Sequence, residues 1–162
     1  MLDRFNSLAP EAAEEALLAC CASPAWAARV VAARPYPTSA DLVVAGVNAF
    51  DELGWSDLRQ VLAAHPRVGE RPTGDATEAA WSRHEQVEVS ARELAEANEA
   101  YERRFGHLFL VFAAGRSAED ILAEAHSRLG NDDETEQTVV RGELRKIVEL
   151  RLERLAESVE VA

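Results

Sequence analysis

Several features by which protein classes are recognised are scarce in this 162-residue sequence. Its two cysteines, Cys20 and Cys21, are neighbours within a helical pattern, so we expect reduced packing residues and a reducing compartment. Every apolar run is shorter than the ~18–20 residues of a membrane-spanning helix. Residues 1–22 also lack the basic start and apolar core of a signal peptide. These absences predict a soluble, cytoplasmic protein.

Basic residues are outnumbered by acidic ones. The sequence has 17 Lys and Arg against 29 Asp and Glu, which gives a formal net charge of −12. A surface this negative repels phosphate backbones and anionic lipid headgroups. We therefore expect neither a nucleic-acid partner nor a membrane partner.

Motifs for bound cofactors and metals are missing as well. There is no G-x-x-x-x-G-K-[ST] loop, no G-x-G-x-x-G fingerprint and no G-x-S-x-G elbow. The four histidines do not have H-x-x-x-H or H-E-x-x-H spacing. Any chemistry is therefore expected to need neither a cofactor nor a metal ion.

Helix-forming residues are abundant: Ala, Leu, Glu and Arg supply 84 of the 162 residues. This composition predicts an all-α fold, with residues 1–162 forming a single domain of about eight helices and residues 158–162 a frayed tail. All six prolines lie within the first 72 residues, so the first half should contain the shorter helices. The expected helices cover residues 9–21, 24–33, 40–53, 56–64, 76–89, 91–104, 117–129 and 133–157.

Local signals support some of these boundaries. Pro10 and Pro24 suit first helical turns, and Thr38 with Asp41 suits a helix N-terminus. The apolar segment 105–114, FGHLFLVFAA, is either a buried extended stretch or a core helix interrupted by Gly106.

An arginine interrupts the apolar face of the last expected helix. That face carries Val140, Leu144, Ile147, Val148 and Leu155. At about 100° per residue, Arg151 projects into the middle of this stripe. A buried guanidinium needs an anionic partner. Arg151 therefore forms a structural ion pair, lets its charged end reach solvent, or binds an anionic substrate, for which this acidic chain needs a local positive group.

Two further segments carry groups that can transfer protons. Pro66 disfavours helix at His65, so this imidazole should lie in a loop just after a helix, either as a proton donor or as a plain surface residue. Ser82 and Glu85 share one face of an expected helix, while His84 is turned away. The simpler alternative there is a solvated helix with ordinary charges.

These segments, taken in chain order, resemble one known family, 2-oxo-4-hydroxy-4-carboxy-5-ureidoimidazoline (OHCU) decarboxylase. The segments that carry the resemblance are Phe5-Asn6, Cys20-Cys21 with Trp26, Arg34-Pro35, His65-Pro66-Arg67-Val68-Gly69, Ser82-x-x-Glu85-Gln86, Asn98-x-x-Tyr101, Arg104-Phe105-Gly106, Phe109 to Gly115, and Glu143-Leu144 through Leu150-Arg151-Leu152. The sequence departs from the family pattern at His107, where an aromatic residue is expected, and in a shortened segment 87–108.

The resemblance implies a cofactor-independent, all-α enzyme of uric acid degradation that converts OHCU to (S)-allantoin and carbon dioxide. It assigns catalytic roles to His65, Glu85 and Arg151, and relatives imply a homodimer. The substrate-binding residues that it implies are Pro66, Ser82, Gln86, Phe109, Leu110, Val111, Phe112 and Ala113.

Two other interpretations remain open. One is a decarboxylase or tautomerase for a related ureido or imidazole acid. The other is a non-catalytic helical interaction module, which gives no reason for Arg151 to lie on an apolar stripe.

Overall fold

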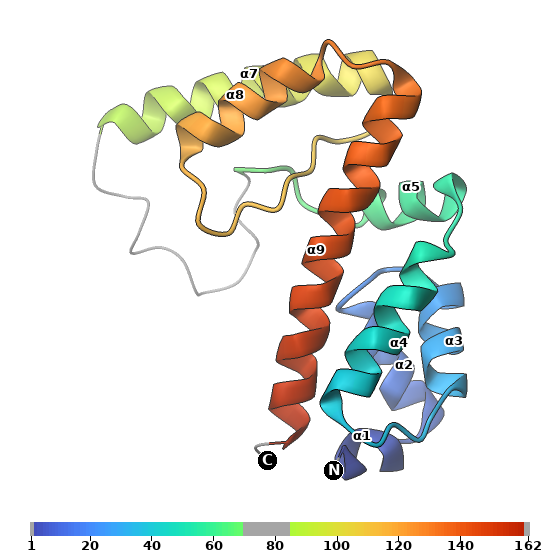
Figure 1. Ribbon diagram of the computed structural model, residues 1–162. Helices are drawn as coiled ribbons and strands as arrows, with labels where there is room; N and C mark the ends of the chain where they lie inside the picture. The colour runs from blue at the N-terminus through green and yellow to red at the C-terminus, as the bar shows by residue number, and fades with distance from the viewer. Residues whose placement is uncertain (1, 70–84, 161–162) are drawn as a thin grey trace. The chain divides into compact units, whose positions relative to one another are not determined.

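The computed structural model describes residues 2–69 and 85–160. Within these ranges the chain forms eight helices and no strand (Figure 1), which confirms the all-α prediction. The helices are α1 (Asp3–Ser7), α2 (Pro10–Leu18), α3 (Pro24–Ala32), α4 (Ser39–Asp51), α5 (Trp55–Ala63), α7 (Glu85–Phe105), α8 (Ala118–Arg128) and α9 (Asp133–Glu160).

The chain divides into two compact units. Residues Met1–Ala64 and Arg141–Ala162 form the first unit, and His65–Val140 form the second. The first unit therefore contains α1 to α5 and most of α9. The second contains α7, α8 and the first turns of α9.

Several helices begin as the sequence predicts. Pro10 and Pro24 occupy the first turns of α2 and α3. At α4, Thr38 Oγ1 accepts a hydrogen bond from the Asp41 backbone N–H at 3.2 Å, and Asp41 Oδ2 accepts one from the Thr38 N–H at 3.0 Å. The same reciprocal arrangement begins α8. These bonds satisfy backbone donors that a helix leaves unpaired at its start.

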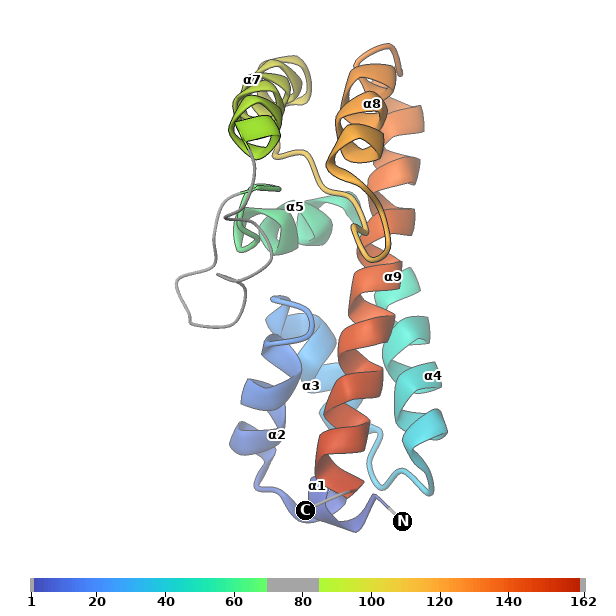
Figure 2. The same cartoon turned by 90° about the vertical axis from the view of Figure 1, so that its left-hand side faces the viewer.

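The core of the first unit includes a close approach at Gly46 of α4. Trp26 is 1% exposed, and its Nε1 donates a hydrogen bond to the Gly46 carbonyl at 2.8 Å. A Cβ atom at Gly46 would lie 2.5 Å from Leu152 Cδ1, so a larger residue would require the buried Leu152 side chain of α9 to shift. Figures 1 and 2 show α4 and this part of α9 running side by side.

The short helix α1 is absent from the sequence prediction. Phe5 is fully buried, and Arg34 Nη1 donates to the carbonyls of Phe5 and Leu8 at 3.1 and 2.8 Å. Asn6 exchanges two hydrogen bonds of 2.9 Å with the backbone of Tyr36. Five residues are too few for a periodic pattern or for a stable isolated helix. Contacts from residues 34–36 stabilise α1, and local sequence does not reveal them.

In the second unit the structure corrects one predicted boundary. The expected break between helices 76–89 and 91–104 is wrong, because α7 continues from Glu85 to Phe105. This stretch contains neither glycine nor proline, so no residue in it disrupts the helical hydrogen bonds. Residues 76–84 lie outside the described part of the chain. In the first unit, α9 continues through Glu160 and so includes the beginning of the stretch 158–162 that is expected to fray.

The core of the second unit joins α7 and α8 to the segment that follows α7. Its buried members are Leu94, Ala97, Tyr101, Phe109, Val111, Ile121 and Ala125. The segment 107–113 is not helical, and Phe109, Leu110 and Val111 are at most 4% exposed. Of the two structures predicted for the segment 105–114, the core helix interrupted by Gly106 is wrong, and the part of the segment that is buried without helix is Phe109 to Val111. Gly106 ends α7 with a φ of +74°.

Candidate functional site

His65 lies in the loop that leaves α5. The helix ends at Ala63 as expected from Pro66, and His65 is half-buried while Pro66 is exposed. The helical hydrogen bonds cannot continue through a proline. The predicted position of this imidazole, directly after a helix end, is confirmed.

The residues after Pro66 bind the loop to α7. Asn98 is 4% exposed and its Nδ2 donates a hydrogen bond to the Val68 carbonyl at 2.9 Å. The Arg67 guanidinium pairs with the Glu102 carboxylate through Nε–Oε1 at 2.5 Å and Nη2–Oε2 at 2.9 Å. These two bonds from Arg67 lower the pKa of Glu102 below its ordinary value. The loop is therefore attached to α7 by three side-chain hydrogen bonds.

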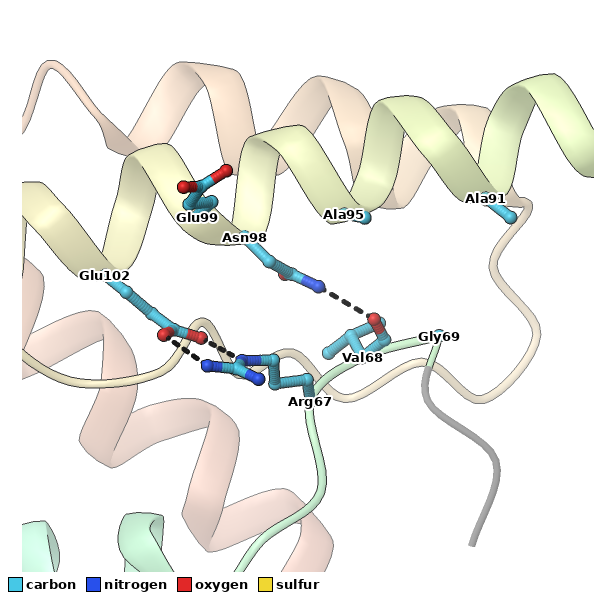
Figure 3. A pocket seen from close by; sticks show the side chains of 8 residues that line it. All are labelled: Arg67, Val68, Gly69, Ala91, Ala95, Asn98, Glu99 and Glu102. Atoms are coloured by element: carbon cyan, nitrogen blue, oxygen red, sulfur yellow. Dashed lines mark hydrogen bonds and ion pairs between the residues drawn. The ribbon is translucent and has the colours of Figure 1, made fainter.

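A pocket of about 390 Å³ lies between this loop and α7 (Figure 3). It is lined by Arg67, Val68, Gly69, Ala91, Ala95, Asn98, Glu99 and Glu102. None of these described lining residues is a predicted site residue. The pocket thus begins directly after the predicted site residues His65 and Pro66 along the chain. Its lining includes the residues that bond the loop to α7, namely Arg67, Val68, Asn98 and Glu102.

The predicted acidic partner lies at the start of α7. Glu85 and Gln86 are the first two residues of this helix, and only their backbone is described. Ser82 lies outside the described residues. His65 and Glu85 belong to the second unit, and Arg151 belongs to the first.

The predicted backbone-binding segment is held by a buried arginine. Arg128 of α8 is 4% exposed, and its Nη1 donates to the Leu110 carbonyl at 2.7 Å. Phe109 and Val111 are buried, Phe112 is half-buried and Ala113 is exposed. The segment therefore passes from the core of the second unit to its surface.

Arg128 belongs to a buried polar network that sequence reasoning missed. Its Nε and Nη2 lie 2.7 and 2.5 Å from Oε1 of Glu136, which is fully buried. The Tyr101 hydroxyl also donates to Glu136, and Asn131 Nδ2 donates to the second carboxylate oxygen at 2.9 Å. Burial raises the pKa of Tyr101, and the bond to Glu136 raises it further. Burial alone would lower the pKa of Arg128, but its bonds to Glu136 and Tyr101 raise it.

The signal that could have found Arg128 is the one used for Arg151. Ile121, Ala125 and Arg128 lie on one face of α8 and all three are buried. An arginine on the apolar stripe of a helix needs a partner inside the protein. Here the partner is the Glu136 carboxylate.

Arg151 lies at the edge of the buried stripe of α9 and not in its middle as predicted, because Ile147, Arg151 and Leu155 form a half-buried row beside the fully buried one. The buried members of that stripe are Val140, Leu144, Val148, Leu152 and Ala156. Arg151 is half-buried, and its Nη1 donates to the Cys20 carbonyl at 3.4 Å. Among the described residues, no carboxylate lies within ion-pair distance of Arg151. Of the three alternatives for Arg151, the structural ion pair has no partner among the described residues, while a charged end that reaches solvent and an anionic ligand both fit its half-buried position.

The two cysteines beside Arg151 are buried thiols. Burial raises the pKa of Cys20 to about 11 and the pKa of Cys21 to about 12, although Arg151 opposes both shifts. Thiols with such pKa values are protonated at neutral pH and react slowly. This agrees with the packing role expected of them.

His107 occupies an aromatic position in the second unit. Its ring centroid lies 5.5 Å from that of Tyr101 in an edge-to-face arrangement and 6.1 Å from that of Phe105 in a stacked one. Phe109 completes this group of rings, 5.3 Å from Tyr101. The imidazole therefore packs where the family pattern has an aromatic side chain.

No group of three or more His, Cys, Asp or Glu side chains in the described parts of the chain is placed to hold a metal ion. None of the helices at residues 2–69 and 85–160 has the length and hydropathy of a membrane span.

Comparison with known proteins identifies the family. Residues 6–153 match the family model described as OHCU decarboxylase. The chain belongs to the OHCU decarboxylase family. The matched region includes residues of both units, from α1 to α9. The resemblance stated from the sequence motifs is thereby confirmed.

Two proteins with similar sequences match most of this OHCU decarboxylase family member. The sequence is 30% identical over 138 residues to 2-oxo-4-hydroxy-4-carboxy-5-ureidoimidazoline decarboxylase of Amia calva, covering 80% of this chain and 79% of that protein. It is 28% identical over 157 residues to the uric acid degradation bifunctional protein TTL of Arabidopsis thaliana. That match covers 91% of this chain and 48% of the plant protein, so the chain spans about half the length of this relative.

A solved structure shares the fold. The crystal structure of an OHCU decarboxylase in the presence of (S)-allantoin matches with a TM-score of 0.76 and 26% sequence identity. The match covers 89% of this chain and 98% of that one. Similarity to this family therefore extends over nearly all of the chain.

Proposed function

We propose that this protein catalyses the decarboxylation of OHCU to (S)-allantoin and carbon dioxide in uric acid degradation, without a cofactor. The observation that carries the proposal is the family match over residues 6–153, which contains every predicted site residue. The solved relative with (S)-allantoin supports the same product.

The substrate supplies the electron sink that such a reaction needs. Loss of carbon dioxide breaks the bond between the carboxylate and a tetrahedral ring carbon, and the released electron pair passes into the adjacent ring C=N. The nitrogen of that C=N takes a proton. The neighbouring carbon, which bears the ureido group, is then protonated while the hydroxyl becomes a ring carbonyl. The protein therefore has to position the substrate and transfer protons.

We assign the proton transfer to His65. An imidazole changes charge near neutral pH, and the loop after α5 presents it half-buried. If His65 delivers the proton to one face of the ring, the product has a single configuration. Glu85, with His65, holds the hydroxyl and carboxylate so that the breaking bond is perpendicular to the ring.

Arg151 binds the urea or ring carbonyl oxygens in this proposal and stabilises the charge that develops on the ring. Its half-buried position without a described carboxylate partner supports this role. The remaining proposed contacts come from Pro66, Ser82, Gln86 and the backbone N–H groups of residues 109–113.

A stereochemical assay tests the reaction. OHCU is generated from urate with urate oxidase and hydroxyisourate hydrolase, and allantoin is followed by circular dichroism. The uncatalysed reaction is slow and gives racemic product, so this protein should produce a rapidly growing (S)-allantoin signal.

His65→Ala should abolish that signal without unfolding the protein. The matched control is His126→Ala, which removes an exposed histidine on α8 and should leave the signal unchanged. If the wild-type trace coincides with the uncatalysed one while the protein is folded, the proposed substrate is wrong. Related ureido and imidazole acids would then be screened.

We also propose that the two units act together as one domain in a cytoplasmic homodimer. The family match across both units supports the single functional domain, and the reduced, buried cysteines suit a reducing compartment. Light scattering at micromolar concentration should give twice the 17.7 kDa chain mass. A mass equal to one chain would contradict the dimer.

A further inference from the structure

The residues that follow His65 and Pro66 are attached to one face of α7. Arg67 pairs with Glu102, and the Val68 carbonyl accepts a hydrogen bond from Asn98. Figure 3 shows both contacts reaching from the loop to the same side of the helix. Exposed loops are ordinarily mobile, whereas this one is anchored two and three residues after the imidazole.

Gly69 brings the loop backbone close to α7 at a third position. Its φ is +90°, and a Cβ atom there would lie 3.0 Å from Leu94 Cδ2. Leu94, Asn98 and Glu102 are spaced four residues apart, so they form a single row along the helix. Three consecutive loop residues therefore meet three consecutive positions of that row.

Asn98 is placed for its donor rather than for packing. It is 4% exposed, and its Oδ1 is buried without a hydrogen-bond partner among the described residues. A buried acceptor without a hydrogen-bond partner lowers folding stability, and an apolar residue at this position would not have that cost. The hydrogen bond to the Val68 carbonyl is the contact that an apolar residue could not make.

The ion pair has a different character. The side chains of Arg67 and Glu102 are 52% and 26% exposed. Exposed ion pairs add little to folding stability, but two parallel guanidinium–carboxylate bonds fix direction as well as distance. Removing this pair should therefore change the orientation of the loop more than the stability of the protein.

We propose that Arg67, Asn98 and Glu102 are positioning residues that hold the His65 loop in the orientation needed for proton transfer. This inference rests on the proposed decarboxylase function and on the role of His65 within it. The three residues, named here the loop anchor, act through His65.

The first test removes the ion pair with Glu102→Gln, which keeps the size of the side chain. A misplaced catalytic group can cost about 100-fold in rate, so we expect kcat to fall by about tenfold to 100-fold with KM little changed. The enantiomeric excess of (S)-allantoin should also fall, because a loosely held imidazole no longer protonates one face only. A merely structural ion pair would leave the stereochemistry unchanged.

The matched control is Arg92→Gln. This substitution breaks an exposed ion pair between Arg92 and Glu96 of α7. Neither residue of that pair lines the pocket. The kcat of Arg92→Gln should stay within about twofold of wild type, as expected of an exposed pair. The double exchange Arg67→Glu with Glu102→Arg should restore part of the lost kcat by re-forming the pair.

Hydrogen exchange provides a measurement independent of turnover. Backbone amides of His65 and of residues 67–69 should exchange faster in Glu102→Gln than in wild type or Arg92→Gln. Faster exchange with lower kcat supports the loop anchor. Unchanged exchange, or a kcat equal to that of Arg92→Gln, overturns it. A wild-type protein that forms no (S)-allantoin refutes the proposed function, and the exchange rates still decide whether the anchor holds the loop.

Discussion

Arg128 lies on the buried stripe of its helix and Arg151 lies beside one, and their surroundings differ. Arg128 is 4% exposed and bonds to the buried Glu136 carboxylate, the Leu110 carbonyl and the Tyr101 hydroxyl. Arg151 is half-buried, and the one described hydrogen bond of its guanidinium is to the Cys20 carbonyl. The same sequence signal therefore marks a structural arginine in one unit and a candidate ligand-binding arginine in the other. The partner of each guanidinium distinguishes them.

The largest effect is expected from Arg128→Ala. Removing one member of a buried ion pair leaves the other charge unpaired, which costs about 3–5 kcal/mol of folding stability. Chemical denaturation should show this loss for Arg128→Ala. Arg103→Ala, which removes an exposed arginine of α7, should change the free energy of unfolding by less than about 0.5 kcal/mol. Equal stability of the two variants would contradict the structural role of Arg128.

Arg151→Gln should lower the catalytic rate and leave the folding stability nearly unchanged. Loss of a group that stabilises developing charge lowers kcat by about 100-fold or more. Folding stability should change by less than about 1 kcal/mol, since the side chain is half-buried and bonds to one carbonyl. Arg154→Gln on the exposed face of α9 is the matched control, and its kcat should equal that of wild type. A variant Arg151→Gln with normal kcat and lower stability would make Arg151 structural, like Arg128.

The sequence distinguishes these cases only in part. It predicts the all-α fold and the helix end before His65, because composition and proline chemistry are local properties. It places Arg151 in the middle of an apolar stripe, whereas the structure has Arg151 half-buried at the edge of that stripe. It misses α1, which depends on contacts from Arg34, a residue distant in the chain. It also misses the Arg128–Glu136 pair, because the carboxylate comes from another helix.

The candidate site was less predictable than the fold. The HPRVG segment indicates a loop, but the sequence does not show that Arg67 and Val68 bind α7 while His65 stays half-buried. These contacts of the loop depend on the row formed by Leu94, Asn98 and Glu102, which lies about 30 residues away in the chain. The roles of His65, Glu85 and Arg151 remain predictions that the experiments above test.

Gly69→Ala extends the comparison to backbone conformation. Gly69 has a positive φ and a close neighbour in Leu94, so alanine should cost about 1–2 kcal/mol of folding stability. The matched control is Gly142→Ala in α9, where a Cβ atom meets nothing within 4 Å. Alanine there should raise stability by about 0.5–1 kcal/mol. Thermal unfolding measures both, and destabilisation by the two variants alike would contradict the account of Gly69.

A smaller effect is expected from pH. Arg67 lowers the pKa of Glu102 below its ordinary value of 4.5. The ionised carboxylate therefore stabilises the folded state at any pH above 4.5. That contribution is lost as the pH falls through the lowered pKa, because Glu102 is then protonated in both states. Wild type should exceed Glu102→Gln in stability by about 1 kcal/mol or less at pH 7, and the difference should vanish in acid. A difference that grows in acid would contradict this assignment.

The central claim is most directly tested by following (S)-allantoin by circular dichroism for wild type and Arg151→Gln side by side, with the free energy of unfolding measured on the same samples. The account predicts a rapidly growing (S) signal for wild type, a signal slowed by about 100-fold or more for Arg151→Gln, and unfolding free energies within about 1 kcal/mol of each other. Equal (S)-allantoin rates in two folded proteins, or no (S) signal from either, would contradict it.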